Sequence, residues 1–198
     1  MARKKRTQHT SHCKNNKDFK PFLRDEFDCR CAYCLVPEGE IGGSKSFQVD
    51  HYKPKSIFPS LATTYTNLFY ACRDCNAYKA AYWHGLLQKA LGKFIINPCD
   101  HDPDEHLNRS AELWEGLSSA GKWNITRLRL NSPAQIKRRE DRKKLFSLLN
   151  FLKQLKNSFI ENAKQDNSPP PNPNPLESFK NIDDHIGVLE RKLEARLD

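Results

Sequence analysis

The stretch ACRDCNAYK at residues 71–79 decides the fold of this chain, together with CAYC at residues 31–34. Each stretch holds two cysteines with two residues between them, and the four are Cys31, Cys34, Cys72 and Cys75. Two such pairs predict one tetrahedral Zn²⁺ site made of four thiolates, which is structural because no ligand position stays open. The alternative is two chance pairs of thiols buried as small apolar groups.

The remaining cysteines support metal binding over disulfides. The chain has seven cysteines, and an odd number argues against a closed disulfide framework. Cys29 is close enough to compete with Cys31 as a ligand, but only Cys31 and Cys34 have the two-residue spacing. No secretory apolar region follows the N-terminus, so we expect a cytoplasmic protein with reduced thiols. No apolar run is long enough for a membrane span.

Between the cysteine pairs lies SFQVDHYKPKS at residues 46–56. Its alternation predicts a short strand over residues 47–51. Residues 52–66 hold two prolines and a Ser/Thr cluster, which is typical of a loop, and the apolar run at 68–71 predicts a returning strand. Helical composition begins at Arg73. The expected local order is therefore strand, loop, strand and helix.

Chemistry-bearing side chains stand in this unit. Asp50 and His51 are adjacent, so on a strand they point to opposite sides. Asn76 falls in the first turn of the following helix and Lys79 one turn later, on the same face. If that face packs against the strands, Asn76 and Asp50 can reach the same metal ion.

These residues resemble a known family. VDH at residues 49–51, Asn67 in TNLFYAC and CRDCNAYK at residues 72–79 are similar to the motifs of the HNH, or ββα-metal, endonucleases. Asn76 stands where many members have their last histidine. The resemblance covers about residues 28–100, and the zinc-clamped members of the family carry cysteine pairs in these places.

The resemblance implies a role for each residue. His51 would be the general base that deprotonates water, because an imidazole titrates near working pH. Asp50 and Asn76 would hold one catalytic Mg²⁺ or Mn²⁺. Asn67 would bond across the loop and orient the hairpin. An amide oxygen is a weaker ligand than a carboxylate, so the Asn76 variant affects metal preference and affinity.

Positive charge supports a polyanionic partner. The net charge is +9, and nucleic acid is the commonest polyanion that such a surface attracts. Lys53, Lys55 and Lys79 flank the Asp-His pair, and we expect them to contact backbone phosphates of DNA. The alternative is that each is an ordinary solvated lysine.

We predict an α+β fold, with a small ββα-metal core, a zinc clamp of four cysteines and mostly helical C-terminal segments. The predicted parts are a basic arm at 1–20, the nuclease core at 21–110, a helical extension at 111–166, a Pro-rich linker at 167–175 and an amphipathic helix at 176–198. Ser132 and Pro133 favour a helix start, and this helix should run to about residue 163. The last helix should bind either its own domain or a partner.

The most specific resemblance is to small HNH proteins of prokaryotic anti-phage systems, such as the HNH partner of the Septu ATPase. It is carried by DHYKPKS, NLFYAC and CNAYK. It implies a defence nuclease acting on DNA, with a partner ATPase docked through the C-terminal helix. Two other functions stay open: a non-catalytic zinc module that binds nucleic acid, and an interaction subunit of a larger complex.

Overall fold

The computed structural model describes residues 15–165 and 175–197. It divides into two compact units, one within residues 1–137 and one spanning residues 138–196. The N-terminal arm up to residue 14 and the Pro-rich linker up to residue 174 lie outside the described residues. Strands and helices both occur in the first unit, so the fold is α+β as predicted.

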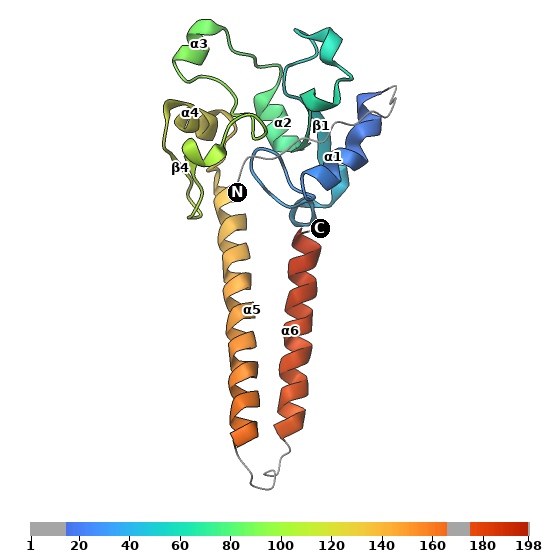
Figure 1. Ribbon diagram of the computed structural model, residues 1–198, viewed down its shortest axis with the longest axis vertical. Coiled ribbons are helices and arrows are strands. Elements are labelled where there is room, and N and C mark those ends of the chain that lie inside the picture. The colour runs from blue at the N-terminus through green and yellow to red at the C-terminus, as the bar shows by residue number, and fades with distance from the viewer. Residues whose placement is uncertain (1–14, 166–174, 198) are drawn as a thin grey trace. The chain divides into compact units, whose positions relative to one another are not determined.

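A two-stranded hairpin followed by a helix forms the centre of the first unit (Figure 1). Strand β1 (Phe47–His51) pairs antiparallel with β2 (Leu68–Cys72), and helix α2 (Arg73–Lys79) follows without a break. The register places Asp50 opposite Phe69 and His51 opposite Leu68. This arrangement confirms the predicted order of strand, loop, strand and helix.

The two strands differ because their surroundings differ. Every residue of β2 is buried, since α1 (Lys20–Glu26) and α2 both contact this strand, and a strand covered on both faces needs a continuous apolar run. Strand β1 is less covered: only Phe47 and Asp50 are buried, and Gln48 is exposed. Phe47 of β1 stacks on Tyr70 of β2 at 4.5 Å between ring centroids, which fixes this register.

Helix α2 is shorter than the sequence predicts. Helical composition continues beyond Arg73, but the helix ends at Lys79, and Ala80 adopts a φ of 50°. The side chain of Lys79 turns into the protein interior, and the guanidinium Nη2 of Arg127 donates to the Lys79 carbonyl oxygen at 3.1 Å. A cation at this position satisfies a carbonyl at the end of the helix and interacts favourably with the negative end of the helix dipole.

Short elements complete the first unit. They are the 3₁₀ turns η1 (Asn16–Phe19), η2 (Glu38–Ile41), η3 (Ser44–Ser46), η4 (Pro59–Leu61), η5 (Tyr65–Asn67) and η6 (Pro103–Glu105), helix α3 (Leu86–Ala90), strands β3 (Leu107–Asn108) and β4 (Glu115–Gly116), and helix α4 (Ser119–Arg127). Helix α4 begins at Ser119 because the Ser118 hydroxyl accepts a hydrogen bond from the Gly121 backbone N–H at 3.1 Å. Buried Asn124 then holds the chain at Phe94 and Ile96 through hydrogen bonds to both backbones.

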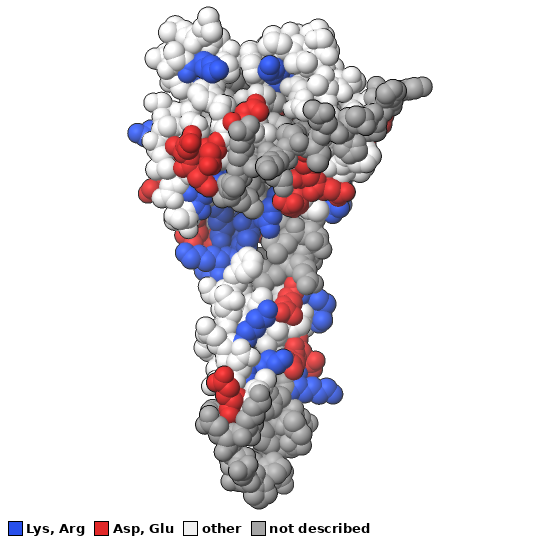
Figure 2. Space-filling view, viewed as in Figure 1, with Lys and Arg blue, Asp and Glu red and all other residues white. Residues whose placement is uncertain are grey.

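The second unit is a pair of helices. Helix α5 (Pro133–Gln165) starts at the predicted proline, and α6 (Pro175–Leu197) is the predicted amphipathic helix. Leu149 and Ile186 are buried between them, and Lys153–Glu190 and Lys156–Asp183 form ion pairs. The space-filling view shows both charges side by side along this pair (Figure 2). Within the described part of the chain, no helix combines the length and apolarity needed to cross a bilayer.

Candidate active site and cysteine cluster

The four predicted cysteines meet in one buried cluster. The sulfur atoms of Cys31, Cys34, Cys72 and Cys75 all lie within 4.8 Å of one another. Over residues 15–165 and 175–197, no other group of three or more His, Cys, Asp and Glu side chains is arranged to hold a metal ion. Cys29 stays outside the cluster, so the two-residue spacing identified the right pair.

The cluster fits Zn²⁺. A Zn–S bond of about 2.3 Å gives a tetrahedron with edges of about 3.8 Å, and the Sγ atoms of Cys34 and Cys72 are 3.7 Å apart. The backbone N–H of Cys75 points at the Sγ of Cys72 at 3.5 Å, a contact that stabilises a thiolate. The Cys31 thiol and its neighbours raise the pKa of Cys75 well above its usual value, because four close sulfurs without a cation favour the protonated form. A bound dication reverses that preference.

Asp50 is a buried carboxylate with two partners from different elements. The ammonium of Lys79 on α2 donates to Oδ1 at 3.0 Å, and the hydroxyl of Tyr33 donates to Oδ2 at 2.5 Å. Burial, strengthened by the adjacent Asp50, raises the pKa of Tyr33 well above its usual value, so this hydroxyl stays a donor. A carboxylate offers about four lone-pair directions, and two neutral or cationic donors therefore leave room for a metal ion.

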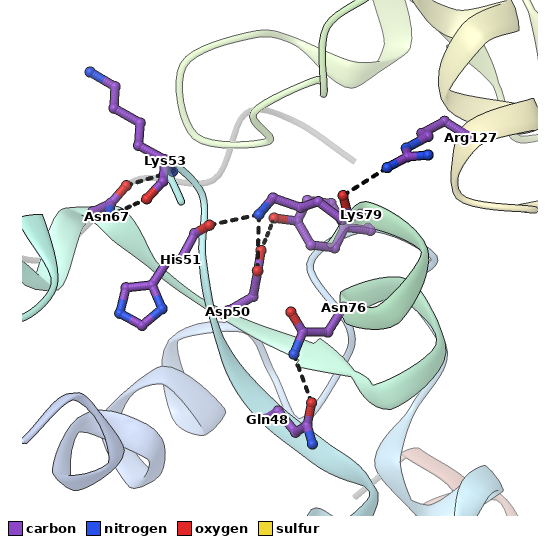
Figure 3. A network of polar contacts seen from close by, with 9 residues as sticks. Gln48, Asp50, His51, Lys53, Asn67, Asn76, Lys79 and Arg127 are labelled. Atoms are coloured by element: carbon purple, nitrogen blue, oxygen red, sulfur yellow. Dashed lines mark hydrogen bonds and ion pairs between the residues drawn. The ribbon is translucent and has the colours of Figure 1, made fainter. Parts of the chain in front are cut away.

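His51 points away from Asp50, as neighbours on a strand must (Figure 3). Its Nε2 lies 2.9 Å from the carbonyl oxygen of Ala62 in the loop. A carbonyl only accepts, so this contact places the imidazole proton on Nε2 and leaves a lone pair on Nδ1. That tautomer is the one a general base needs, with its orientation fixed by the loop.

Asn76 is oriented by a residue that the sequence analysis did not single out. Its Nδ2 donates to Oε1 of Gln48 at 2.7 Å, and its Oδ1 has no hydrogen-bond donor among the described residues. Gln48 precedes Asp50 by two positions, so both share one face of β1. The strand alternation already placed them together and could have identified Gln48.

Asn67 closes the loop that follows β1. Its Oδ1 accepts from the Lys53 amide at 2.8 Å, and its Nδ2 donates to the carbonyls of Lys53 at 3.0 Å and Leu61 at 3.2 Å. These bonds cross the loop at its two ends and determine where Ala62 faces His51. The role of Asn67 in orienting the hairpin stays a prediction.

Asp50, His51 and Asn76 line one cleft of about 550 Å³. Lys55 also lines it, whereas the Lys53 ammonium lies 5.8 Å from the Phe58 ring centroid and 5.7 Å from that of Trp83. Sequence reasoning missed a further set of lining residues from the N-terminal segment: Asn16, Lys17 and Lys20. Their only signal was the basic composition of residues 1–20.

The position of Lys79 corrects a prediction. Its side chain is 1% exposed, and the ammonium binds Asp50 and the carbonyl oxygen of His51, the latter at 2.6 Å. A buried ammonium with these partners has no access to a phosphate, which contradicts the predicted phosphate contact. Lys79 and Asn76 were predicted on one face of the helix, and Lys79 on that face contacts the Asp50 carboxylate and not the solvent.

A test of this buried pair is the replacement of Lys79 by methionine. Removing one partner of a buried ion pair leaves an uncompensated charge and typically costs about 3–5 kcal/mol. We expect Lys79→Met to lower the free energy of unfolding by about that amount in urea titrations. Lys89→Met, on the exposed face of α3, should stay within about 0.5 kcal/mol of the parent.

The double variant Asp50→Asn/Lys79→Met sharpens this test. An amide in place of the carboxylate carries no charge, so the double variant should regain part of the stability lost by Lys79→Met alone. Equal stability of Lys79→Met and its parent would contradict the pair.

Residues 31–81 match the model of the HNH endonuclease family. The chain carries an HNH endonuclease domain. The matched segment contains the cysteine cluster, the hairpin and α2, and ends two residues after Lys79. No solved structure gave a significant match to the chain.

Two curated relatives are Septu proteins. The chain is 29% identical over 102 residues to the Septu protein PtuB of Bacillus thuringiensis, an alignment covering 52% of this chain and 37% of the relative. It is 28% identical over 116 residues to the Septu protein PtuB of Bacillus mycoides (strain KBAB4), covering 46% of this chain and 38% of the relative. The matched region therefore spans under two fifths of each relative, and the similarity is a distant homology.

Proposed function

We propose that this protein is a metal-dependent endonuclease that hydrolyses phosphodiester bonds in DNA. The observation that carries the proposal is one cleft lined by three residues of the HNH domain: Asp50, His51 and Asn76. The alternative of a non-catalytic zinc module needs only the cysteines and positive charge. It gives no reason for an imidazole with a free Nδ1 lone pair in the same cleft as the side-chain oxygens of Asp50 and Asn76.

His51 accepts the proton of the attacking water in this proposal. Its Nδ1 is the basic atom, because Nε2 is committed to the Ala62 carbonyl. Asn67 keeps that carbonyl in place through its bonds to Lys53 and Leu61. The base is therefore oriented before the substrate binds, which is the preorganisation that efficient proton transfer requires.

Asp50 and Asn76 would hold the catalytic Mg²⁺ or Mn²⁺. Carboxylate and amide oxygens suit these hard cations, and a bound cation stabilises the charge that develops on the phosphate and the leaving oxygen. Two protein ligands are few, and the ammonium of Lys79 lies 3.0 Å from Asp50. We therefore expect weak metal binding by the free protein and stronger binding when DNA phosphate adds ligands.

The similarity to Septu proteins suggests a role in anti-phage defence. We propose that the nuclease works with a partner ATPase, docked through α6. One face of this helix packs on α5 through Ile186 and Leu149, so the partner would bind the opposite face, where Val188 is 40% exposed. The four cysteines would hold a structural Zn²⁺ that keeps the hairpin and α2 together.

A cleavage assay tests the proposed activity. Supercoiled and linear duplex DNA, single-stranded DNA, branched DNA and RNA are each incubated with the protein and Mg²⁺ or Mn²⁺. We expect cleavage of at least one DNA, complete inhibition by EDTA, and recovery when excess Mg²⁺ or Mn²⁺ is added.

Zinc analysis of the same samples separates the two metals. Brief EDTA treatment should stop cleavage while one zinc per chain remains, since four buried thiolates release zinc slowly. Cleavage that continues in EDTA, or a protein that cuts no DNA with either metal, would contradict the proposal.

A further inference from the structure

The chain just before α1 is fixed beside the hairpin. The ring of Phe19 is buried against Tyr65, with 5.3 Å between ring centroids. The backbone N–H of Asn15 donates to the Asp18 carboxylate at 3.1 Å in a capping box, and the Lys20 ammonium donates to the Ser44 carbonyl oxygen at 2.7 Å. Residues 15–20 therefore pack as a wall beside the hairpin, although they fall in the basic arm predicted for residues 1–20.

This wall contributes charge to the cleft of Asp50, His51 and Asn76. The lining includes three lysines, Lys17 and Lys20 from the wall and Lys55 from the loop after β1, and a single carboxylate. That carboxylate belongs to Asp50, and its charge is already balanced by a fourth lysine, Lys79. The cleft is thus strongly cationic and suits a polyanion.

Lys17 is the wall residue best placed to bind that anion. Its side chain is exposed, and it makes no ion pair with any residue in 15–165 or 175–197. The carboxylate of the neighbouring Asp18 accepts a hydrogen bond from the Asn15 backbone N–H and does not pair with Lys17. Lys20 spends one donor on Ser44, which leaves two.

We propose that the wall at residues 15–20 is part of the substrate site. In this proposal the Lys17 ammonium binds a backbone phosphate of the cleaved DNA strand, next to the phosphate that is cut. The proposal rests on the proposed nuclease function and adds a second source of substrate contacts, outside the family-matched residues 31–81. Lys55 holds the strand from the loop, so the strand passes over β1 between the two. Contacts to phosphate fix register without reading sequence.

Binding measured in a cleavage-inactive background tests the proposal. In the His51→Ala protein, fluorescence anisotropy with a labelled DNA oligonucleotide gives the dissociation constant from 50 to 200 mM salt. We expect Lys17→Glu to weaken binding roughly tenfold at 100 mM salt, and the slope of log K against log salt to shrink by about 0.9 for a lost duplex phosphate contact. Lys17→Ala should lie between Lys17→Glu and the parent.

Lys122→Glu is the matched control. Lys122 is exposed on α4 and does not line the cleft, yet this variant changes the net charge by the same amount as Lys17→Glu. We expect its dissociation constant to stay within about twofold of the parent. Equal effects of the two substitutions would overturn the proposal, because the charge would then act only through the overall field.

Two results separate this proposal from the nuclease function. With His51 restored, Lys17→Glu should raise the KM for DNA and leave kcat unchanged at saturating DNA, which is the pattern of a binding residue. If the protein cleaves DNA and Lys17→Glu has no effect on binding or KM, only the proposed role of the wall is overturned. If the protein binds DNA through Lys17 and does not cleave it, only the proposed nuclease function is overturned.

Discussion

Replacing His51 by alanine should abolish DNA cleavage while folding, zinc content and DNA binding stay intact. A positioned general base contributes about 10²–10⁴-fold to such a reaction, so a loss in this range is expected. The side chain is half-buried at the end of β1, and its one described hydrogen bond is to the Ala62 carbonyl. Losing that bond costs about 1 kcal/mol, too little to unfold the domain.

A second substitution separates chemistry from packing. Glutamine at position 51 can still donate to the Ala62 carbonyl, but it has no basic nitrogen, so His51→Gln should be as inactive as His51→Ala. His185→Ala, in exposed α6, serves as the histidine control and should cleave like the parent. Cleavage by His51→Ala at the parental rate would reject His51 as the base. If the parent also cut nothing, the non-catalytic zinc module would be the better description.

The sequence contained enough information to predict the hairpin and the cysteine cluster. Alternation over residues 47–51, a continuous apolar run before Cys72 and two matched cysteine pairs are patterns that can be recognised within short stretches of sequence. The structure contains the hairpin, the helix and the cysteine cluster in the predicted order. Local patterns work here because the functional unit is short and continuous in the chain.

Long-range contacts explain what the sequence could not predict. The end of α2 depends on Arg127, which is 48 positions beyond Lys79, and no local signal marks that contact. Tyr33 reaches Asp50 because the turn around Cys31 and Cys34 lies against the hairpin. Lysine at position 79 looked like a surface residue, and only the burial of Asp50 makes it an interior one.

The basic N-terminal segment shows the same limit. A run of lysines and arginines with few apolar residues is typical of a disordered arm. One aromatic residue, Phe19, changes the outcome for residues 15–20, because its ring packs against Tyr65. Composition averages over a window and hides such a single anchor.

Replacing Cys72 by serine should remove the zinc ion and unfold the domain around it. Structural zinc sites in zinc-finger peptides contribute about 10–16 kcal/mol of binding free energy at neutral pH, and this energy is folding energy. Serine is a good helix N-cap, so the capping contact of Cys72 to the Cys75 amide survives the change. The expected loss therefore comes from the metal and not from the helix start.

Metal analysis and thermal unfolding measure this outcome. The parent should hold one zinc per chain and lose its thermal transition in strong chelator, and Cys72→Ser should resemble the chelated parent. Cys29→Ser is the matched control, because Cys29 is close in sequence but outside the cluster, and it should retain one zinc. A soluble parent without zinc, or a Cys72→Ser protein with full zinc and an unchanged transition, would contradict the site.

The position of the cluster should make cleavage depend on zinc even where other parts of the chain stay folded. Cys72 ends β2, Cys75 lies in the first turn of α2, and Asn76 follows directly. A zinc ion held by the cluster would therefore set the angle between the strand pair that carries Asp50 and the helix that carries Asn76. Without zinc, Asp50 and Asn76 would lose their common position. We accordingly expect Cys72→Ser to be inactive even at temperatures where circular dichroism still shows the long helices α5 and α6.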